Sequence, residues 1–250
     1  EIRNFGENPD NVASFGIAFM NGMQDNNVLA CAKHFPGHGD TDSDSHKTLP
    51  IVNHSRKRLD DVELFPFRKL INNGLGAVMV AHLNIPILDN TKDLPTSLSP
   101  KVIDGLLKEE LGFTGLSITD GLNMQGVTKF YSSGLLDVKA LLAGNDVLLF
   151  SEDIPKAIEE IKKAISNGAI SQEEVDRRSH EILKAKEWMQ VHLFQDIKID
   201  SLIHRLNTNH ARVLKRKLIA ASLTLPINKN NLIPLKNLDT LRVASLAIGN

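Results

Sequence analysis

The fold is decided by residues 97–124, which read SLSPKVIDGLLKEELGFTGLSITDGLNM. The pair that begins at Ser99 supplies an N-cap and a first-turn proline, apolar residues then recur at helical spacing, and Gly112 ends the predicted helix. The short apolar run GLSIT (115–119) follows, and Asp120 comes directly after it. A helix that leads straight into a short buried strand is typical of a βαβ unit, so this stretch predicts a parallel sheet.

Three other apolar runs have the same character. They are continuous rather than alternating, which predicts strands that are buried on both faces. They read VLACAK (28–33), GAVMVAH (76–82) and DVLLF (146–150). Helical patterns lie between or after these runs, and a capping box at Ser171 opens the last of them. The helices are predicted over residues 99–111, 135–142, 154–165 and 171–189.

Four strand–helix units predict an α/β fold. A closed (β/α)8 TIM barrel needs eight strands and roughly 250 residues, so the visible units are either the C-terminal portion of such a barrel or a small open sheet. The chain begins at Glu1 and not at a methionine, which predicts that an N-terminal part is missing from this sequence and favours the C-terminal portion of a barrel. Because a partial barrel exposes strand edges, we do not expect this chain to act as an enzyme unless the remaining part is supplied.

The character of the sequence changes after the last predicted helix. We expect residues 1–195 to be the C-terminal part of a TIM-barrel domain and residues 196–240 to be a helical linker segment with a basic stretch. The run LRVASLAIGN (241–250) predicts a new strand and, with it, the start of a second α/β domain.

The composition excludes some classes of protein. With 29 basic and 30 acidic residues the chain has no general attraction for nucleic acid, and no apolar stretch approaches the roughly 20 residues of a membrane span. The single cysteine, Cys31, cannot form an internal disulfide and is expected to pack as a small apolar side chain. Any targeting segment would lie upstream of Glu1, so the compartment stays open, with a slight preference for periplasm or secretion because a second domain is expected to follow.

A polar loop, KHFPGHGDTDSDSH (33–46), follows the first predicted strand. Its alternating aspartates are similar to the start of a calcium-binding loop, but Ser45 and Ile51 stand where such a loop needs glycine and glutamate. Its three histidines match no standard zinc spacing. We therefore expect no metal and no organic cofactor. The position of the loop at the carboxyl end of a strand favours part of an active site over a merely solvated turn.

Asp44 and His46 suit general acid–base chemistry. They stand two residues apart, so in an extended segment their side chains face the same way, and the carboxylate can fix the imidazole tautomer and favour its protonated form. Glycines in the loop would permit it to move. Asp120 is the best partner for this pair because it also follows a predicted strand, although a helix N-cap is the structural alternative for a lone aspartate there.

Two stretches taken together resemble glycoside hydrolase family 3, and specifically its bacterial β-N-acetylglucosaminidase (β-hexosaminidase) branch. They are KHFPGHGDTDSDSHKTLP (33–50) and SITDGLNMQGV (117–127). RNFGENPDNV (3–12) is similar to the family's R-x-F-G-x-(D/N)-P segment, and the stretch from HLNIPILDN to the aspartate resembles the family almost throughout. NLIPLKN (231–237) is similar to the linker into the family's second domain.

The resemblance implies a role for particular residues. Asp120 matches the nucleophile, His46 matches the acid/base, and Asp44 matches its dyad partner. Three further residues match positions that bind the sugar, namely Arg3, Lys33 and His34. Many relatives carry a second aspartate where this chain has Gly121, but that residue is not the nucleophile.

The leading function is therefore a retaining exo-β-N-acetylglucosaminidase that acts on a carbohydrate substrate, cell-wall-derived or other, through a covalent glycosyl-enzyme. A family 3 β-glucosidase or xylosidase is an alternative, although such relatives usually take the acid/base from another domain. A β-N-acetylglucosaminide phosphorylase also stays open, because a neutral imidazole does not repel phosphate as a carboxylate does. A glycan-binding relative without activity would not need Asp120, Asp44 and His46 together.

Overall fold

The computed structural model describes residues 5–41, 48–193, 196–236, 239–240, 242 and 244. The chain divides into two compact units, Glu1–Phe194 and Gln195–Asn250. The first unit carries the sheet and the candidate site.

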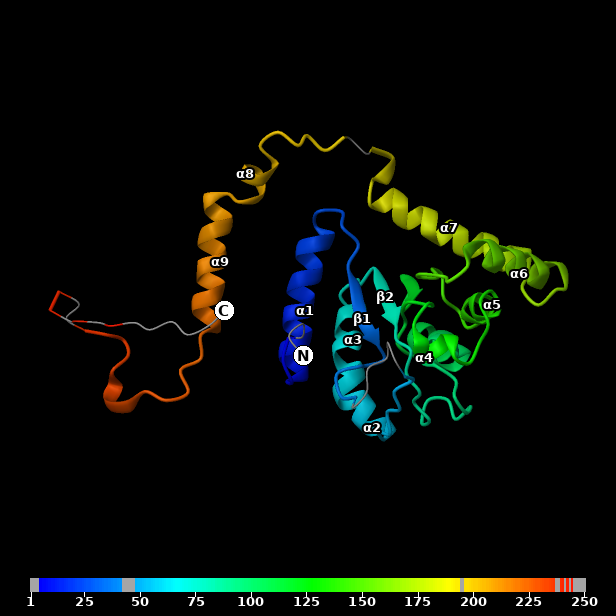
Figure 1. The fold of residues 1–250 in the computed structure, drawn as a ribbon, viewed down its shortest axis with the longest axis horizontal. Coiled ribbons are helices and arrows are strands. Elements are labelled where there is room, and N and C mark those ends of the chain that lie inside the picture. The colour runs from blue at the N-terminus through cyan, green and yellow to red at the C-terminus, as the bar shows by residue number, and fades with distance from the viewer. Residues whose placement is uncertain are drawn as a thin grey trace. The chain divides into compact units, whose positions relative to one another are not determined.

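Three parallel strands form a sheet within the described residues of the first unit (Figure 1). Their order in the sheet follows the sequence, with β2 in the middle, as expected when each strand is followed by a helical crossover. This confirms the predicted α/β fold with a parallel sheet. The strands are β1 (Cys31–Phe35), β2 (Ala77–Val80) and β3 (Leu116–Thr119).

The two pairings in this sheet differ. Strands β2 and β3 pair without interruption, whereas the register of β1 on β2 shifts between Ala32 and Phe35. An irregularity of this kind changes the direction of the side chains within it. Both Lys33 and His34 lie in the shifted part, at the carboxyl end of the strand.

Most of the helices in the first unit lie between or after the strands, as the alternation predicts. Asn8 caps the first of them, because its side-chain oxygen accepts a hydrogen bond of 3.0 Å from the backbone N–H of Asn11. The α-helices are α1 (Pro9–Gln24), α2 (Arg56–Arg58), α3 (Leu64–Ile71), α4 (Gln125–Thr128), α5 (Leu135–Leu142), α6 (Ile154–Ser166) and α7 (Gln172–Trp188). Shorter or wider helical segments are η1 (Leu59–Glu63), η2 (Thr96–Leu98), η3 (Lys101–Glu110) and η4 (Val191–Leu193).

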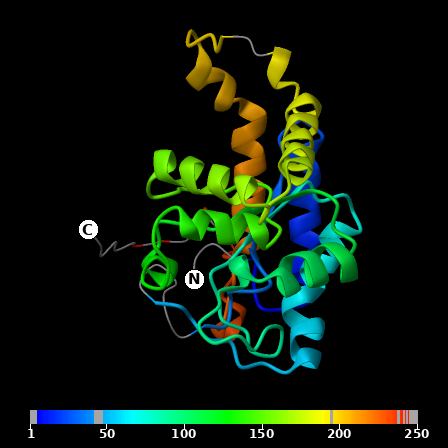
Figure 2. The same cartoon turned by 90° about the vertical axis from the view of Figure 1, so that its right-hand side faces the viewer.

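One apolar core joins the sheet to α1, α3 and η3. Phe35 of β1 is fully buried and meets Phe67 of α3 edge-on, with ring centroids 5.2 Å apart. Val102 and Leu107 of η3 are also fully buried in this core. A second cluster packs α5 against α6, which lie side by side in Figure 2. These contacts cover the sheet and leave the carboxyl ends of the strands for polar side chains.

Several predicted boundaries hold. The predicted helices over 135–142, 154–165 and 171–189 correspond to α5, α6 and α7, and Ser171 accepts a hydrogen bond of 3.1 Å from the backbone N–H of Glu174 at the start of α7. The predicted strand over 28–33 begins three residues late, at Cys31. Cys31 is exposed, so the prediction that it packs as a small apolar side chain is wrong.

The predicted strand over residues 146–150 is also wrong. A single bridge joins Val147 to Ile118 of β3, and the rest of the segment pairs irregularly. The reason is that side chains take the place of backbone partners: Asp146 accepts from the backbone N–H of Ser117 at 2.8 Å, and Thr119 Oγ1 accepts from the backbone N–H of Leu149 at 2.9 Å. The segment therefore lies along β3 without forming a regular ladder.

The second unit contains helices whose apolar residues are exposed. These helices are α8 (Leu202–Leu206) and α9 (Asn209–Ser222), and the short polar η5 (Lys229–Asn231) follows them. The predicted strand over 241–250 lies outside the described residues except for 242 and 244, so it stays a prediction. Among the helices of the described ranges, none combines the length and the apolar character needed to span a bilayer.

Candidate active site

Asp120 stands at the carboxyl end of β3, as the sequence predicts. Its backbone N–H donates a hydrogen bond of 2.9 Å to the carbonyl of Val80 on β2, which continues the sheet for one more residue. Its Oδ1 accepts from the backbone N–H of Gly121 at 2.8 Å, and its side chain is 16% exposed. The backbone and one carboxylate oxygen are thus held in place while Oδ2 faces the neighbouring strand end.

His34 reaches Asp120 from β1, across the end of β2. The distance from His34 Nε2 to Asp120 Oδ2 is 4.0 Å, and the histidine side chain is 28% exposed. These two residues are 86 positions apart in the chain, so the sheet topology and not local sequence brings them together. Lys33 is exposed in the same irregular part of β1.

His34 also contacts the polar loop that follows β1. Its ring lies edge-on to the ring of His38, with centroids 5.8 Å apart, and His38 Nδ1 is 2.9 Å from Thr41 Oγ1. A chain of side chains therefore runs from the carboxylate at the end of β3 to the first part of the loop. Three predicted site residues, Arg3, Asp44 and His46, lie outside the described residues.

His82 is a buried histidine behind Asp120. It follows β2 and has no exposed surface. Its Nε2 lies 3.0 Å from the carbonyl of Gly121, and its Nδ1 lies 2.6 Å from Ser97 Oγ. Because a carbonyl only accepts, Nε2 carries the proton, and Nδ1 accepts from the serine hydroxyl. This pattern fits the neutral imidazole and fixes the turn that holds Asp120.

The direction of the pKa shift of His82 also favours the neutral imidazole. Burial lowers the pKa of His82 from its usual value, while the Gly121 carbonyl and the negative charge of Asp120 act in the opposite direction. The buried network continues beyond Ser97, whose carbonyl accepts a hydrogen bond of 2.9 Å from Asn145 Nδ2. A histidine at the end of a predicted strand is the available sequence signal, but its supporting role depends on partners 15 and 39 residues away.

Comparison with known proteins gives a consistent result. Residues 1–185 match the family described as glycosyl hydrolase family 3 N terminal domain. The chain is 37% identical over 158 residues to beta-hexosaminidase A of Pseudoalteromonas piscicida, covering 59% of this chain and 26% of that protein. It is 34% identical over 164 residues to a beta-hexosaminidase of Hydrogenovibrio crunogenus, covering 66% of this chain and 45% of that protein.

A solved structure is similar as well. A glycoside hydrolase family 3 beta-N-acetylglucosaminidase from Paenibacillus sp. str. FPU-7 superposes with a TM-score of 0.80 at 39% identity, over 86% of this chain and 41% of that one. The chain thus spans between about a quarter and just under half of these relatives.

Proposed function

The chain belongs to glycosyl hydrolase family 3, and from that premise we propose that it is part of a retaining exo-β-N-acetylglucosaminidase that removes terminal β-linked GlcNAc from cell-wall-derived or other glycans. One observation carries the proposal. Asp120 and His34 converge to 4.0 Å at the carboxyl ends of two parallel strands, where α/β folds place their chemistry.

The proposed reaction has two steps. The Asp120 carboxylate attacks the anomeric carbon as the bond to the leaving oxygen breaks, and protonated His46 gives its proton to that oxygen. Neutral His46 then takes a proton from water, which attacks the same carbon and releases the sugar from Asp120. Asp44 would orient the imidazole. These roles of His46 and Asp44 are supported by the sequence resemblance.

The three sugar-binding roles belong to the same proposal. Lys33 and His34 lie in β1, and His34 reaches Asp120, so a ring bound over this end of the sheet would contact both strands. Arg3 would bind the same ring. We further propose that residues 1–195 are the C-terminal part of a (β/α)8 barrel, that residues 196–240 are a helical linker, and that 241–250 begin a second α/β domain. The three parallel strands and the family match support that arrangement.

The decisive experiment is covalent labelling of the full-length protein. A mechanism-based 2-fluoro sugar with a good leaving group should glycosylate one carboxylate, because the fluorine slows both steps and the good leaving group restores only the first. Peptide mapping should find the sugar on Asp120. Turnover should be faster with p-nitrophenyl β-GlcNAc than with the matching β-glucoside. A label on another residue would remove the nucleophile assignment, and a preference for the glucoside would remove the substrate assignment.

A further inference from the structure

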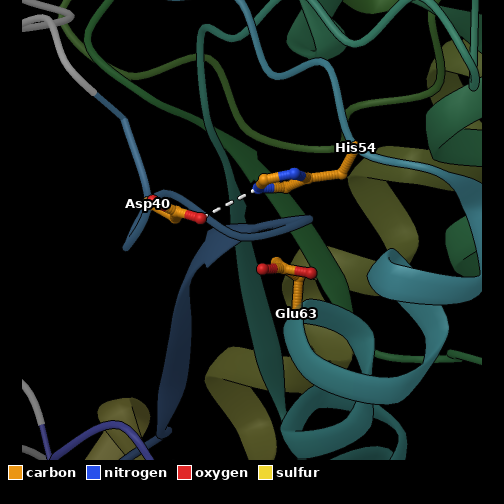
Figure 3. A group of neighbouring side chains, drawn as sticks. All are labelled: Asp40, His54 and Glu63. Atoms are coloured by element: carbon orange, nitrogen blue, oxygen red, sulfur yellow. Dashed lines mark ion pairs between the residues drawn. The ribbon is translucent and has the colours of Figure 1, made fainter.

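A second group of titratable side chains lies apart from the Asp120 carboxylate. Figure 3 shows Asp40, His54 and Glu63 pointing toward one another, with a close contact between the first two. They come from three segments: the loop after β1, the stretch before α2, and the end of η1. One potential ligand atom of each residue lies within 4.8 Å of the other two.

The imidazole of His54 lacks a satisfactory partner. Its Nε2 is buried and lies 3.1 Å from Asp40 Oδ2, but this contact lacks hydrogen-bond geometry, and no other hydrogen bond reaches the atom among the described residues. A buried nitrogen without a hydrogen bond is costly, and a bound ion is one of the ordinary explanations for it. This observation points to a ligand and is independent of the charges nearby.

The charges of the group are not balanced. Asp40 and Glu63 bring two negative charges, and Arg58 is the cation that contacts both, with Nη2 at 3.5 Å from Asp40 Oδ2 and at 3.0 Å from Glu63 Oε1. The adjacent cations have other partners, because Arg56 pairs with Asp60 and Lys57 pairs with Asp61. One positive charge therefore serves two carboxylates.

Glu63 gives the group a fixed side. Its side chain is 7% exposed and packs directly under the loop, since a Cβ on Gly37 would lie 2.6 Å from Glu63 Cβ. Asp40, by contrast, is 62% exposed and can move. Ligands about 2.0–2.2 Å from a shared tetrahedral ion lie roughly 3.5 Å apart, so a modest movement of Asp40 and His54 toward Glu63 would complete the set.

We propose that Asp40, His54 and Glu63 bind one divalent transition-metal ion of the zinc type. One imidazole and two carboxylates form the three-ligand set that zinc accepts with a further position left to water. Calcium and magnesium fit less well because they prefer more ligands and all-oxygen surroundings. Arg58 is the resident competitor. Its Nε and Nη2 both donate to Glu63, at 3.1 and 3.0 Å, and the Glu63 side chain is 7% exposed, so a metal ion has to displace this two-point pair into solvent.

The sequence analysis does not predict this group. The histidines considered for zinc were those of the polar loop, whereas His54 and Glu63 follow it in a segment with no ligand spacing. The expectation that the reaction needs no metal is a separate matter, because the site lies on other residues than Asp120 and His34.

The test is isothermal titration of the chelator-treated full-length protein with zinc chloride. Wild type should take up one zinc ion per chain at this site, and the His54→Gln and Asp40→Asn variants should lose that ion. His180→Gln, which changes an exposed histidine on α7, is the matched control and should keep it. Arg58→Gln should bind zinc about two- to fivefold more tightly, because it removes the competing ion pair. Folding of each variant is checked by thermal melting without zinc.

The outcomes separate this proposal from the enzymatic one, because binding is measured without turnover. No saturable uptake by wild type, uptake that survives His54→Gln, or weaker binding by Arg58→Gln would each overturn the metal site. Loss of the ion in His34→Gln alone would place it beside Asp120 instead and would equally overturn the assignment to Asp40, His54 and Glu63. A gain of affinity in Arg58→Gln cannot come from misfolding, so it is the strongest supporting result.

Discussion

The ends of β3 and β1 carry the two halves of the candidate site, and different forces hold them. Behind β3, Asp120 is fixed by sheet hydrogen bonds and by the fully buried His82, which bridges Gly121 and Ser97. After β1, Asp40 is 62% exposed, and its contacts are His54 Nε2 at 3.1 Å and the half-exposed Arg58 at 3.5 Å. Buried neutral hydrogen bonds are costly to break, whereas exposed ion pairs contribute little. Within the described residues, a carboxylate fixed by buried contacts thus contrasts with a loop residue, Asp40, whose contacts are exposed to solvent.

This difference suits the proposed reaction. A nucleophile has to keep its orientation through both steps, so a fixed carboxylate is an advantage. An acid/base on a movable loop can approach when substrate is bound, and it then avoids forming a resting ion pair with Asp120 that would neutralise both groups. Substitutions at the β3 end should therefore have larger effects than substitutions in the loop after β1. Four predictions follow, from the largest expected effect to the smallest.

The largest effect is expected for Asp120→Asn. The amide keeps the shape of the side chain but cannot form the glycosyl ester, so kcat should fall on the order of 10⁴-fold while the fold is preserved. Turnover of p-nitrophenyl β-GlcNAc by the full-length protein measures this. A variant that keeps more than a tenth of the wild-type rate would show that the rigid end is not the nucleophilic end.

His82→Ala should have the next largest effect. The change leaves the buried Ser97 hydroxyl without its His82 partner, removes one of the two donors to the Gly121 carbonyl, which keeps the backbone N–H of Met124 at 3.1 Å, and opens a cavity. Together these losses should lower the free energy of unfolding by about 3–5 kcal/mol. Urea denaturation measures the loss. His82→Gln, which can keep one of the two hydrogen bonds, is the control and should lose about half as much. Equal losses in the two variants would contradict this expectation, because glutamine refills most of the cavity and restores one hydrogen bond, so only the complete two-sided bridge would then matter.

Glu174→Gln tests a third site, which lies on helix α7. The pKa of Glu174 is lowered to about 2. The largest cause is the hydrogen bonds from Arg177, burial acts in the opposite direction, and the hydrogen bonds from Arg178 lower the pKa further. A carboxyl with a lowered pKa stabilises the fold above its unfolded pKa of about 4.3, and this contribution is lost as pH falls toward 2. Because the side chain is 34% exposed, we expect only about 1–2 kcal/mol.

The measurement is unfolding of wild type and Glu174→Gln between pH 2 and pH 7. The difference between them should be largest above pH 5 and should shrink as the solution becomes more acidic. A difference that stays constant with pH would show that the carboxylate charge does not contribute and that the loss comes from packing alone.

The sequence predicts the rigid end better than the loop end. Strand β3, the position of Asp120 after it and the helix that precedes it all follow from residues within a window of about 25, since capping residues, apolar spacing and glycine act locally. Helix α1 is not among the predicted helices, although it also has a local signal, the Asn8–Pro9 pair at its start. These features are local, so a single sequence can reveal them.

Other features depend on partners that are distant in the chain. The segment 146–150 has the composition of a strand, but the side chains of Asp146 and Thr119 take hydrogen bonds that a ladder would use. His82 and Asn145 meet through Ser97, and no spacing predicts that meeting. The sequence predicts Asp120 directly after a strand and matches His34 to a sugar-binding position, but the approach of the two side chains to 4.0 Å depends on the parallel sheet, which brings the carboxyl ends of its strands to one edge.

The smallest effect is expected for Asp40→Asn, and it tests the weak end of the comparison directly. Asp40 is 62% exposed, and its contacts to His54 at 3.1 Å and Arg58 at 3.5 Å are screened by solvent, so the free energy of unfolding should change by less than about 1 kcal/mol. The loss should shrink further as salt is raised, because salt screens exposed pairs more than buried hydrogen bonds. Urea denaturation at low and high salt, beside His82→Ala, gives the comparison. If Asp40→Asn costs as much as His82→Ala in the absence of metal, the loop end is as firmly fixed as the β3 end, and the reasoning from a movable acid/base loses its physical basis.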